Sequence, residues 1–362
     1  MRILMISRAT LYTVKGGDTV QIMQTAEALR MLGYTVDIIL SNERKIEYNA
    51  YHLIHFFNII RPADIMYHTY KSNLPYVVST VYVDYSTWES YDKGRPNWYR
   101  WLGSDAREYV KAIARMLVNR ESIMSFRYLL TGHRASVKHV IKHAAMLLPN
   151  SESEYQRLAK HYKINAAYRT VVNGADTDFF KCDDEILAQK NNKMVLCAGR
   201  IEGRKNQLNL IRALNDSEFT LYIIGKAAPN HKDYYYQCKA IAAGNIHFVD
   251  ECNREELRRY YHQAKVHVLP SWFETTGLSS LEALFCGCNI VVSDYGDTKE
   301  YFPTDGILYC NPGDINNILK QVKAAAGADF NKAQADFLKS KFNWHKAGLQ
   351  TEQAYKEVLR AL

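Results

Sequence analysis

Residues 266–287 read VHVLPSWFETTGLSSLEALFCG. The stretch opens with a short β-branched apolar run that ends in Pro-Ser, which predicts a buried parallel strand. The residues after Ser280 are good helix formers, and Gly287 provides a stop signal at the end of that helix. The stretch therefore predicts a strand, a short loop and a helix, which is the repeating unit of an α/β sheet protein.

Two glutamates flank the small residues of this loop. Glu274 follows the carboxyl end of the strand, and Glu282 lies about one turn into the helix. A helix N-terminus presents unpaired N–H groups that favour an anion such as phosphate, and carboxylates accept hydrogen bonds from sugar hydroxyls. A phosphate between two polyols indicates a nucleotide sugar, although both glutamates also fit ordinary surface positions. The intervening candidates for donor binding are Thr275, Thr276, Gly277 and Leu278.

Length and composition restrict the class of protein. A chain of 362 residues with 47% hydrophobic residues predicts two domains with ordinary cores. No run approaches the roughly 20 apolar residues that span a bilayer, and MRILMIS at the start predicts a first strand rather than a signal peptide. The seven cysteines are scattered, which favours reduced thiols in the cytoplasm over a metal site.

Strands and helices alternate along both halves of the chain, so the sequence predicts an α/β fold with two Rossmann-like domains of parallel sheets. We expect domains at 1–177 and 193–342, joined by a polar linker at 178–192. The expected strands are 2–7, 34–40, 52–57, 76–82, 144–151, 193–199, 220–225, 246–250, 266–271, 289–294 and 306–310. The expected helices are 19–33, 63–72, most of 104–143, 206–214 and 254–264.

Two further loops follow predicted strands and precede predicted helices. In CAGRIEGRKN (197–206), Gly199 and Arg200 follow a strand and Lys205 comes five residues later, so both cations can reach one diphosphate. Arg204 is expected to be a solvated neighbour. In KGGDT (15–19), Gly16 and Gly17 permit close approach of a ligand to a helix N-terminus.

Positive charge is concentrated in residues 94–143. This segment contains ten Lys/Arg and three Asp/Glu, a net charge of +7 out of +8 for the chain. Such a segment predicts an anionic partner, either a membrane surface, a phosphorylated acceptor or nucleic acid, or else a solvated helix face. No recognised nucleic-acid module is present, so nucleic acid is not expected.

Taken together, these segments resemble the retaining glycosyltransferases of family 4, within the glycosyl transferases group 1, which have the GT-B fold. CAGRIEGRKN resembles the G-R-x-x-x-x-K-N diphosphate motif, and FETTGLSSLEAL matches the E-x7-E motif. The resemblance extends over most of the chain through GGDTVQIMQTAEALRMLGYTV, PNSESE and VVNGADTDFF. It implies two Rossmann-like domains whose sheets face a central cleft, with a helix at about 343–362 returning to the first domain.

The resemblance also implies a role for each candidate residue. Glu274 would bind hydroxyls of the donor sugar and Glu282 the ribose. Arg200 and Lys205, with the N–H groups near Gly277 and Leu278, would hold the diphosphate without a metal ion or other cofactor. Glu274, Arg200 and Lys205 are the candidate catalytic residues. The base would lie near Asp250, Glu251 and Cys252.

The first domain would receive a glycan or polyprenyl-diphosphate-linked acceptor. There the sequence departs from the family, because many members carry a T-x-H run where this chain has Thr80-Val81-Tyr82. The candidate residues on the acceptor side are Tyr82, Asp84 and Tyr85. We therefore expect a cytoplasmic enzyme of surface-polysaccharide synthesis that is peripheral on the inner face of the cytoplasmic membrane. A nucleotide-sugar epimerase and a degenerate sugar-binding or scaffold protein are the alternatives.

Overall fold

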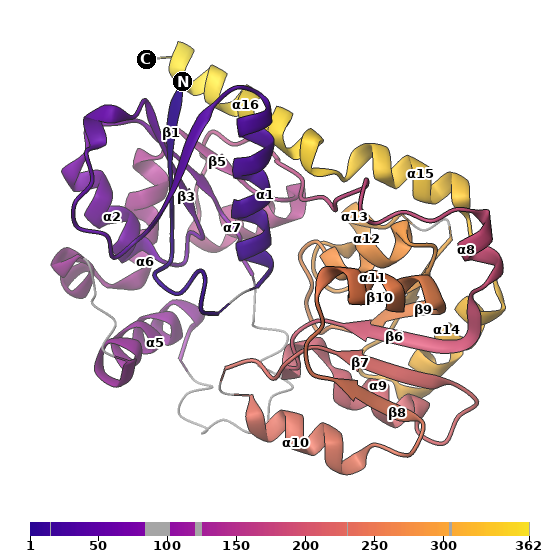
Figure 1. The fold of residues 1–362 in the computed structure, drawn as a ribbon. Coiled ribbons are helices and arrows are strands. Elements are labelled where there is room, and N and C mark those ends of the chain that lie inside the picture. Colours follow the sequence, from indigo (N-terminus) through magenta and orange to yellow (C-terminus); the bar gives the residue numbers. More distant parts are fainter. Residues whose placement is uncertain (15, 84–101, 120–124, 230, 304–305, 362) are drawn as a thin grey trace. The chain divides into compact units, whose positions relative to one another are not determined.

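The computed structural model describes residues 1–14, 16–83, 102–119, 125–229, 231–303 and 306–361. The chain divides into two compact units (Figure 1). The first comprises Met1–Asn173 and Trp344–Leu362, and the second comprises Gly174–Asn343.

The first unit is built on a parallel sheet with the strand order β2-β1-β3-β4-β5. Its strands follow the expected apolar runs: β1 (Arg2–Ser7), β2 (Thr35–Leu40), β3 (Leu53–Phe57), β4 (Tyr76–Ser79) and β5 (Met146–Leu148). Ile3, Ile54 and Val78 on three of these strands are completely buried, because both faces of the sheet are covered. The helices of the unit are α1 (Gly17–Met31), α2 (Pro62–Lys71), α5 (Ser104–Asn119), α6 (Phe126–His143), α7 (Glu152–Tyr162) and α16 (Trp344–Arg360), and a short 3-10 helix spans Tyr48–Ala50.

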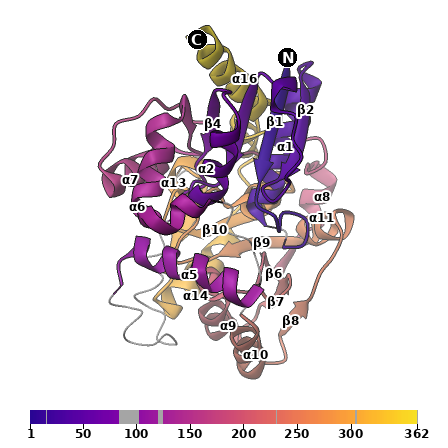
Figure 2. The same ribbon diagram turned by 90° about the vertical axis from the view of Figure 1, so that its left-hand side faces the viewer.

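The last helix, α16, packs against α1 within this unit (Figure 1, Figure 2). Gly348 makes this close approach feasible, because a Cβ atom built there would lie 2.7 Å from the Cβ of Ala28. Tyr355 of the same helix donates to Nδ1 of His55 on β3 at 2.6 Å, or accepts from it, depending on the histidine tautomer. The end of the described chain is thereby anchored to the sheet that its beginning forms.

Most of the described part of the basic segment is helical, as expected, and forms α5 and α6. Residues 120–124 between α5 and α6 lie outside the described residues. Gly132 interrupts α6 with a φ of 77°, a left-handed conformation that glycine adopts without strain. No helix in the described ranges is long and apolar enough to cross a bilayer.

The second unit is built on a parallel sheet with the order β11-β10-β9-β6-β7-β8. Its strands are β6 (Asn191–Ala198), β7 (Thr220–Ile224), β8 (Ile246–Val249), β9 (Ala264–Leu269), β10 (Asn289–Ser293) and β11 (Ile307–Cys310). Its helices are α8 (Asp184–Ala188), α9 (Gln207–Leu214), α10 (Lys232–Ile241), α11 (Arg254–Gln263), α12 (Leu278–Phe285), α13 (Thr298–Tyr301), α14 (Ile315–Gly327) and α15 (Lys332–Lys341), with a 3-10 turn at Gly203–Lys205. The stretch expected as a linker lies in this unit and contains α8.

The strand order of the second unit reverses between β6 and β9, which are neighbours in the sheet. In an open parallel sheet, the loops that leave such a reversal point diverge and form a crevice at the carboxyl ends of the strands. The two loops concerned are the ones that contain CAGRIEGRKN and PSWFETTG.

Candidate functional site

The candidate site lies at the carboxyl ends of β6 and β9, where the strand order reverses. Arg200 and Lys205 follow β6, and Glu274 follows β9. Asn206 holds the first of these loops in place, since its buried side-chain amide donates to the carbonyl oxygens of Pro270 (3.1 Å) and Pro312 (2.8 Å). The structure therefore brings the three predicted catalytic residues together.

Glycines allow the backbone segments around the site to touch. A Cβ atom at Gly225, which follows β7, would lie 2.1 Å from the carbonyl oxygen of Gly199. A Cβ atom at Gly296, which follows β10, would lie 2.1 Å from the carbonyl oxygen of Glu274. Any other residue at either position would displace a loop of the site, because real side chains do not approach backbone atoms this closely.

Lys205 and Glu274 form a buried ion pair. The Lys205 ammonium group donates to Oε2 of Glu274 at 2.5 Å, and the two side chains are only 13% and 9% exposed. The Ser271 hydroxyl donates to the same Oε2 at 3.3 Å, and the Arg204 guanidinium group lies 3.8 Å from it. Within the described residues, every polar contact of this carboxylate is made by Oε2, which leaves Oε1 available to a ligand.

The charges around Glu274 keep it ionised. Burial alone would raise the pKa of this carboxyl, but Lys205 and then Arg204 outweigh burial and lower the pKa below its ordinary value. The same balance applies to Glu202. Burial raises the pKa of this carboxyl, but Arg204, Arg200 and Lys205 together have the larger effect, so its pKa lies below the ordinary value. The site is therefore a compact cluster of three cations and two carboxylates.

The structure corrects the expectation that Arg204 is a solvated neighbour. Its side chain is only 15% exposed, and it donates to the carbonyl oxygen of Phe273 at 2.6 Å and to Oε1 of Glu202 at 2.8 Å. Arg204 therefore fastens the loop after β6 to the loop after β9. Arg200 is the solvated cation, because its side chain is 41% exposed and its contact with Glu202 is long, at 3.9 Å.

The predicted helix begins directly beyond this cluster. Gly277 caps α12 in a left-handed conformation with a φ of 68°, and a Cβ atom there would lie 3.3 Å from the ring of Phe302. Thr275, Thr276 and Leu278 lie beside it in the sequence. The first N–H groups of the helix therefore lie at the same end of β9 as Glu274. These groups add partial positive charge to the cluster.

Glu282 lies on α12, as expected, and is half-buried. Burial raises the pKa of its carboxyl to about 7, against which a hydrogen bond from the Tyr261 hydroxyl (3.3 Å to Oε2) has a smaller lowering effect. Near neutral pH this carboxyl is therefore divided between its charged and neutral forms. Hydroxyl donors from a ligand would favour the charged form.

Asp250, Glu251 and Cys252 follow β8 at the edge of the sheet, two strands away from β6. Asp250 accepts a hydrogen bond from the Tyr235 hydroxyl at 2.9 Å, and Glu251 pairs with Lys226, both of their side chains being 64% exposed. Neither of these two contacts involves the cluster around Glu274. Their predicted role in binding the base stays a prediction.

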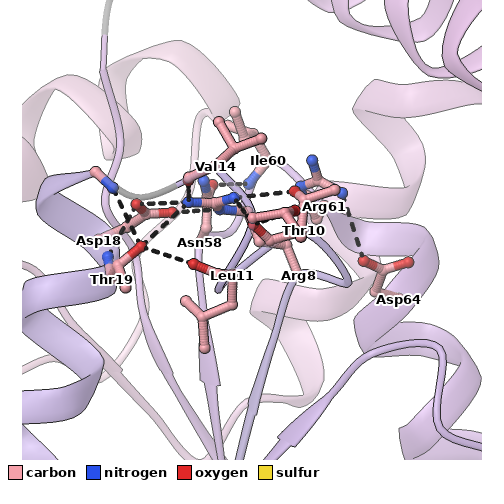
Figure 3. A network of polar contacts seen from close by, with 12 residues as sticks. Arg8, Thr10, Leu11, Val14, Asp18, Thr19, Asn58, Ile60, Arg61 and Asp64 are labelled. Carbon is pink, nitrogen blue, oxygen red and sulfur yellow. Dashed lines mark hydrogen bonds and ion pairs between the residues drawn. The ribbon is translucent and has the colours of Figure 1, made fainter. Parts of the chain in front are cut away.

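In the first unit the strand order reverses between β1 and β3, and a polar network occupies that point (Figure 3). Arg8 follows β1 and donates two hydrogen bonds to the Asp18 carboxylate, from Nε to Oδ2 at 2.6 Å and from Nη2 to Oδ1 at 3.0 Å. It also donates to the carbonyl oxygens of Thr10 (2.8 Å) and Val14 (2.6 Å), so its side chain closes the loop that leads to α1. The sequence signal for Arg8 is its place directly after a strand.

Gly16 and Gly17 stand at the start of α1, beside this network. Gly16 has an extended backbone, and its N–H donates to the Thr19 hydroxyl at 3.2 Å. The structure thus places both glycines at a helix N-terminus, as expected. Their predicted contact with the donor stays a prediction.

In the segment predicted to face the acceptor, the backbone after β4 is strained. Val81 has a φ of 45°, which is rare for a β-branched residue. The buried carboxylate of Glu154 holds the turn by accepting from the Thr80 hydroxyl and from the Tyr82 N–H (2.7 Å), both at Oε1. Tyr82 is thus fixed at this edge, while Asp84 and Tyr85 lie outside the described residues.

Comparisons with known proteins agree with the resemblance seen in the sequence. Residues 178–332 match the family of glycosyl transferases group 1. A D-inositol 3-phosphate glycosyltransferase of Streptomyces bingchenggensis is 26% identical over 253 residues, which is 62% of this chain and 55% of that relative. Across the first three curated relatives, the match spans 48% to 61% of the relative's own length.

Solved structures confirm the GT-B fold over the whole chain. Sucrose-phosphate synthase from Thermosynechococcus elongatus superposes with a TM-score of 0.78 at 18% identity and covers 100% of both chains. The Anabaena protein HepE in complex with UDP-glucose superposes with a TM-score of 0.71 at 14% identity and covers 99% of this chain and 100% of that one. At this level of identity the likeness establishes the fold.

Proposed function

We propose that this chain, which has the GT-B fold and whose residues 178–332 match the glycosyl transferases group 1, is a retaining glycosyltransferase of family 4 type. The enzyme transfers a sugar, of the hexosyl or N-acetylhexosaminyl type, from a nucleotide-diphosphate sugar to a glycan or polyprenyl-diphosphate-linked acceptor. Surface-polysaccharide synthesis in the cytoplasm is the process that such an acceptor serves.

The observation that carries the proposal is the asymmetric carboxylate of Glu274. Its Oε2 atom is neutralised by Lys205 at 2.5 Å, whereas Oε1 forms no hydrogen bond or ion pair with the described residues. A lone carboxylate would repel a diphosphate, but one neutralised by a lysine can lie beside it and still accept a hydroxyl through its second oxygen. This pairing suits a ligand that has a sugar directly attached to a diphosphate.

The reaction breaks the bond between the anomeric carbon and the diphosphate oxygen, and the acceptor oxygen bonds to that carbon on the same face. The departing phosphate oxygen takes the acceptor's proton, so that atoms and charges balance without a separate base. Negative charge grows on the diphosphate during this step, and fixed cations and helix N–H groups stabilise it most where water is excluded. We assign that role to Arg200, Lys205 and the start of α12.

The proposed reaction uses no metal ion, because these cations would stabilise the leaving diphosphate instead. Among the described residues, no group of three or more His, Cys, Asp or Glu side chains is arranged to hold a metal ion. That observation does not test the mechanism, and metal independence is checked by assaying transfer with and without a chelator.

The proposal is tested with purified protein and a panel of UDP-, GDP-, ADP- and CDP-sugars. One class of donor should raise the melting temperature, and its sugar should move to an added acceptor. Arg200→Gln should weaken donor binding about tenfold without loss of stability, because the side chain is exposed and loosely paired. Arg212→Gln on the exposed side of α9 is the matched control and should bind as the parent does.

Two outcomes would contradict the proposal. Formation of a new sugar from the donor alone, with no acceptor, would indicate an epimerase. If no nucleotide sugar binds and none is consumed, the donor assignment is wrong.

A further inference from the structure

The turn after β4 has a conformation that its own residues disfavour. Val81 has a φ of 45°, and its β-branched side chain makes this left-handed conformation costly. Asn58, which follows the neighbouring strand β3, also has a positive φ of 76°, and its N–H donates to the carbonyl oxygen of Ser79 at 2.9 Å. Such outliers persist only where the surroundings hold them, and they cluster at functional sites.

The carboxylate of Glu154 joins this turn to the rest of the unit. Thr80 and Glu154 are completely buried. The Oε1 atom accepts from the Thr80 hydroxyl and from the Tyr82 N–H (2.7 Å), the two neighbours of Val81. The Oε2 atom accepts from the N–H of Asn150, after β5, at 2.9 Å. One carboxylate therefore connects the ends of β4 and β5.

Asn150 is itself held by the first helix of the unit. Nε2 of Gln21 on α1 donates to Oδ1 of Asn150 at 2.8 Å, and both side chains are buried. The network therefore extends from α1 through the end of β5 and the start of α7 to the turn after β4. A buried network that connects four elements is the kind of support that a strained turn requires.

A role in capping α7 does not account for the contacts of the Glu154 carboxylate. Glu154 is the third residue of α7, and its N–H donates to the hydroxyl of the cap residue Ser151 at 3.0 Å. In a capping box, the carboxylate of the third residue returns to the N–H of the cap residue. Here the carboxylate accepts instead from Asn150, which precedes the cap, and from the turn after β4.

Val81 has open backbone groups at this strand end. It is partly exposed, and within the described ranges its N–H and carbonyl groups form no hydrogen bond. Open parallel sheets bind ligands beyond the carboxyl ends of their strands. The cations and carboxylates assigned to the donor all lie in the second unit, so a ligand at this strand end would be the second substrate. A peptide N–H and a carbonyl suit the hydroxyl groups of a sugar.

We propose that Glu154 is a positioning residue for the acceptor. It holds the turn in the left-handed conformation in which the N–H and carbonyl groups of Val81 bind hydroxyl groups of an acceptor sugar. Without the carboxylate the turn relaxes, and the affinity falls in proportion to the fraction of molecules that keep the binding conformation. The identity of the ligand as an acceptor rests on the proposed function, but its binding is measured without a donor.

The test measures binding of octyl glucoside, octyl galactoside and octyl mannoside to the whole chain by saturation-transfer NMR, below their micellar concentrations. The parent should bind at least one of them. Glu154→Gln should raise the dissociation constant of that glycoside about tenfold, because an amide cannot accept hydrogen bonds at both of its ends. Thr80→Val removes one bond to the carboxylate and should raise it about threefold, which keeps the test decisive if Glu154→Gln does not fold.

A second substitution separates positioning of the turn from general support of the fold. Glycine adopts a left-handed φ without strain, so Glu154→Gln in the Val81→Gly background should raise the dissociation constant only about twofold. Ser151→Ala is the matched control, because it removes the cap of the same helix and leaves the bonds to the turn in place. It should bind the glycoside as the parent does. Amide hydrogen exchange in β1 checks that the first unit is folded in each variant.

Four results would overturn the proposal. No glycoside binds the parent, Glu154→Gln binds as the parent does, its effect is equally large in the Val81→Gly background, or Ser151→Ala weakens binding as much. The donor panel is a separate measurement. If a donor binds but no glycoside does, this inference fails and the proposed function stands. If no donor binds but the glycoside pattern is as expected, the proposed function fails and Glu154 still positions the turn for a sugar.

Discussion

The buried pair of Lys205 and Glu274 is best tested by a double-mutant cycle. Its side chains are 13% and 9% exposed, so removing one partner leaves a charge that is poorly solvated. Lys205→Met and Glu274→Gln should therefore each destabilise the second unit by about 3 kcal/mol. The double variant removes both charges and should lose about 3 kcal/mol instead of the additive value of about 6, which gives a coupling energy of about 3 kcal/mol.

The measurement must report on the second unit alone, because a chain of two units need not unfold in one step. Amide hydrogen exchange in β6 and β9 provides that readout. The matched control is the pair of Lys226 and Glu251, also a lysine with a glutamate but with both side chains 64% exposed. Its coupling energy should be about 0.5 kcal/mol or less.

The cycle also separates stability from chemistry. The double variant should be no less stable than either single variant and yet should transfer no sugar, since the proposed donor contacts are lost. A coupling energy no larger than that of the control pair would show that the reasoning about the buried pair is wrong.

Three other predictions follow from strained, buried or crowded positions. Burial raises the pKa of Glu282 from about 4.5 to about 7, so the folded state binds more protons than the unfolded state between those values and stability falls as pH rises through them. Glu282→Gln should remove that fall and stabilise the second unit by about 2 kcal/mol at pH 8 but not at pH 4, as measured by amide hydrogen exchange in β9, while weakening donor binding. Val81→Gly relieves a φ of 45° and should stabilise the first unit by about 1 kcal/mol, measured by hydrogen exchange in β4; equal or lower stability would mean that the turn stores no strain. Gly225→Ala places a Cβ atom 2.1 Å from the carbonyl oxygen of Gly199 and should cost about 3 kcal/mol or more in the second unit, whereas Gly244→Ala, with open space around it, should cost less than about 1 kcal/mol.

Much of the fold was predictable because buried parallel strands are short apolar runs. The run before Pro270 became β9, and the runs at the start of each half became β1 and β6. The convergence of Arg200, Lys205 and Glu274 was predictable as well, since loops after parallel strands share one edge of the sheet. These inferences need only the order of strands and loops along the chain.

Contacts that depend on tertiary approach were not predictable. Arg204 and Lys205 are adjacent cations, and nothing in the sequence indicates that the first reaches the carbonyl oxygen of Phe273 while the second meets a carboxylate. Gly225 and Gly296 are single glycines after strands, and only the packed loops show that each must lack a Cβ atom. The break at Gly132 within α6 was not predictable from the apolar spacing, which indicated only that most of 104–143 is helical.

The charges around Glu274 balance one another, so the cluster is stable by itself and is still suited to bind a charged ligand. Three cations alone would repel one another where they are partly buried, and two carboxylates alone would repel a diphosphate. In the folded protein, Lys205 neutralises one oxygen of Glu274, and Arg204 joins the two loops. Both side chains are therefore already held in place and need not leave water when a ligand binds. In the proposed reaction, the exposed Arg200 would be the cation with the most freedom to move onto the diphosphate, and the other charges would form the prearranged surroundings in which negative charge develops.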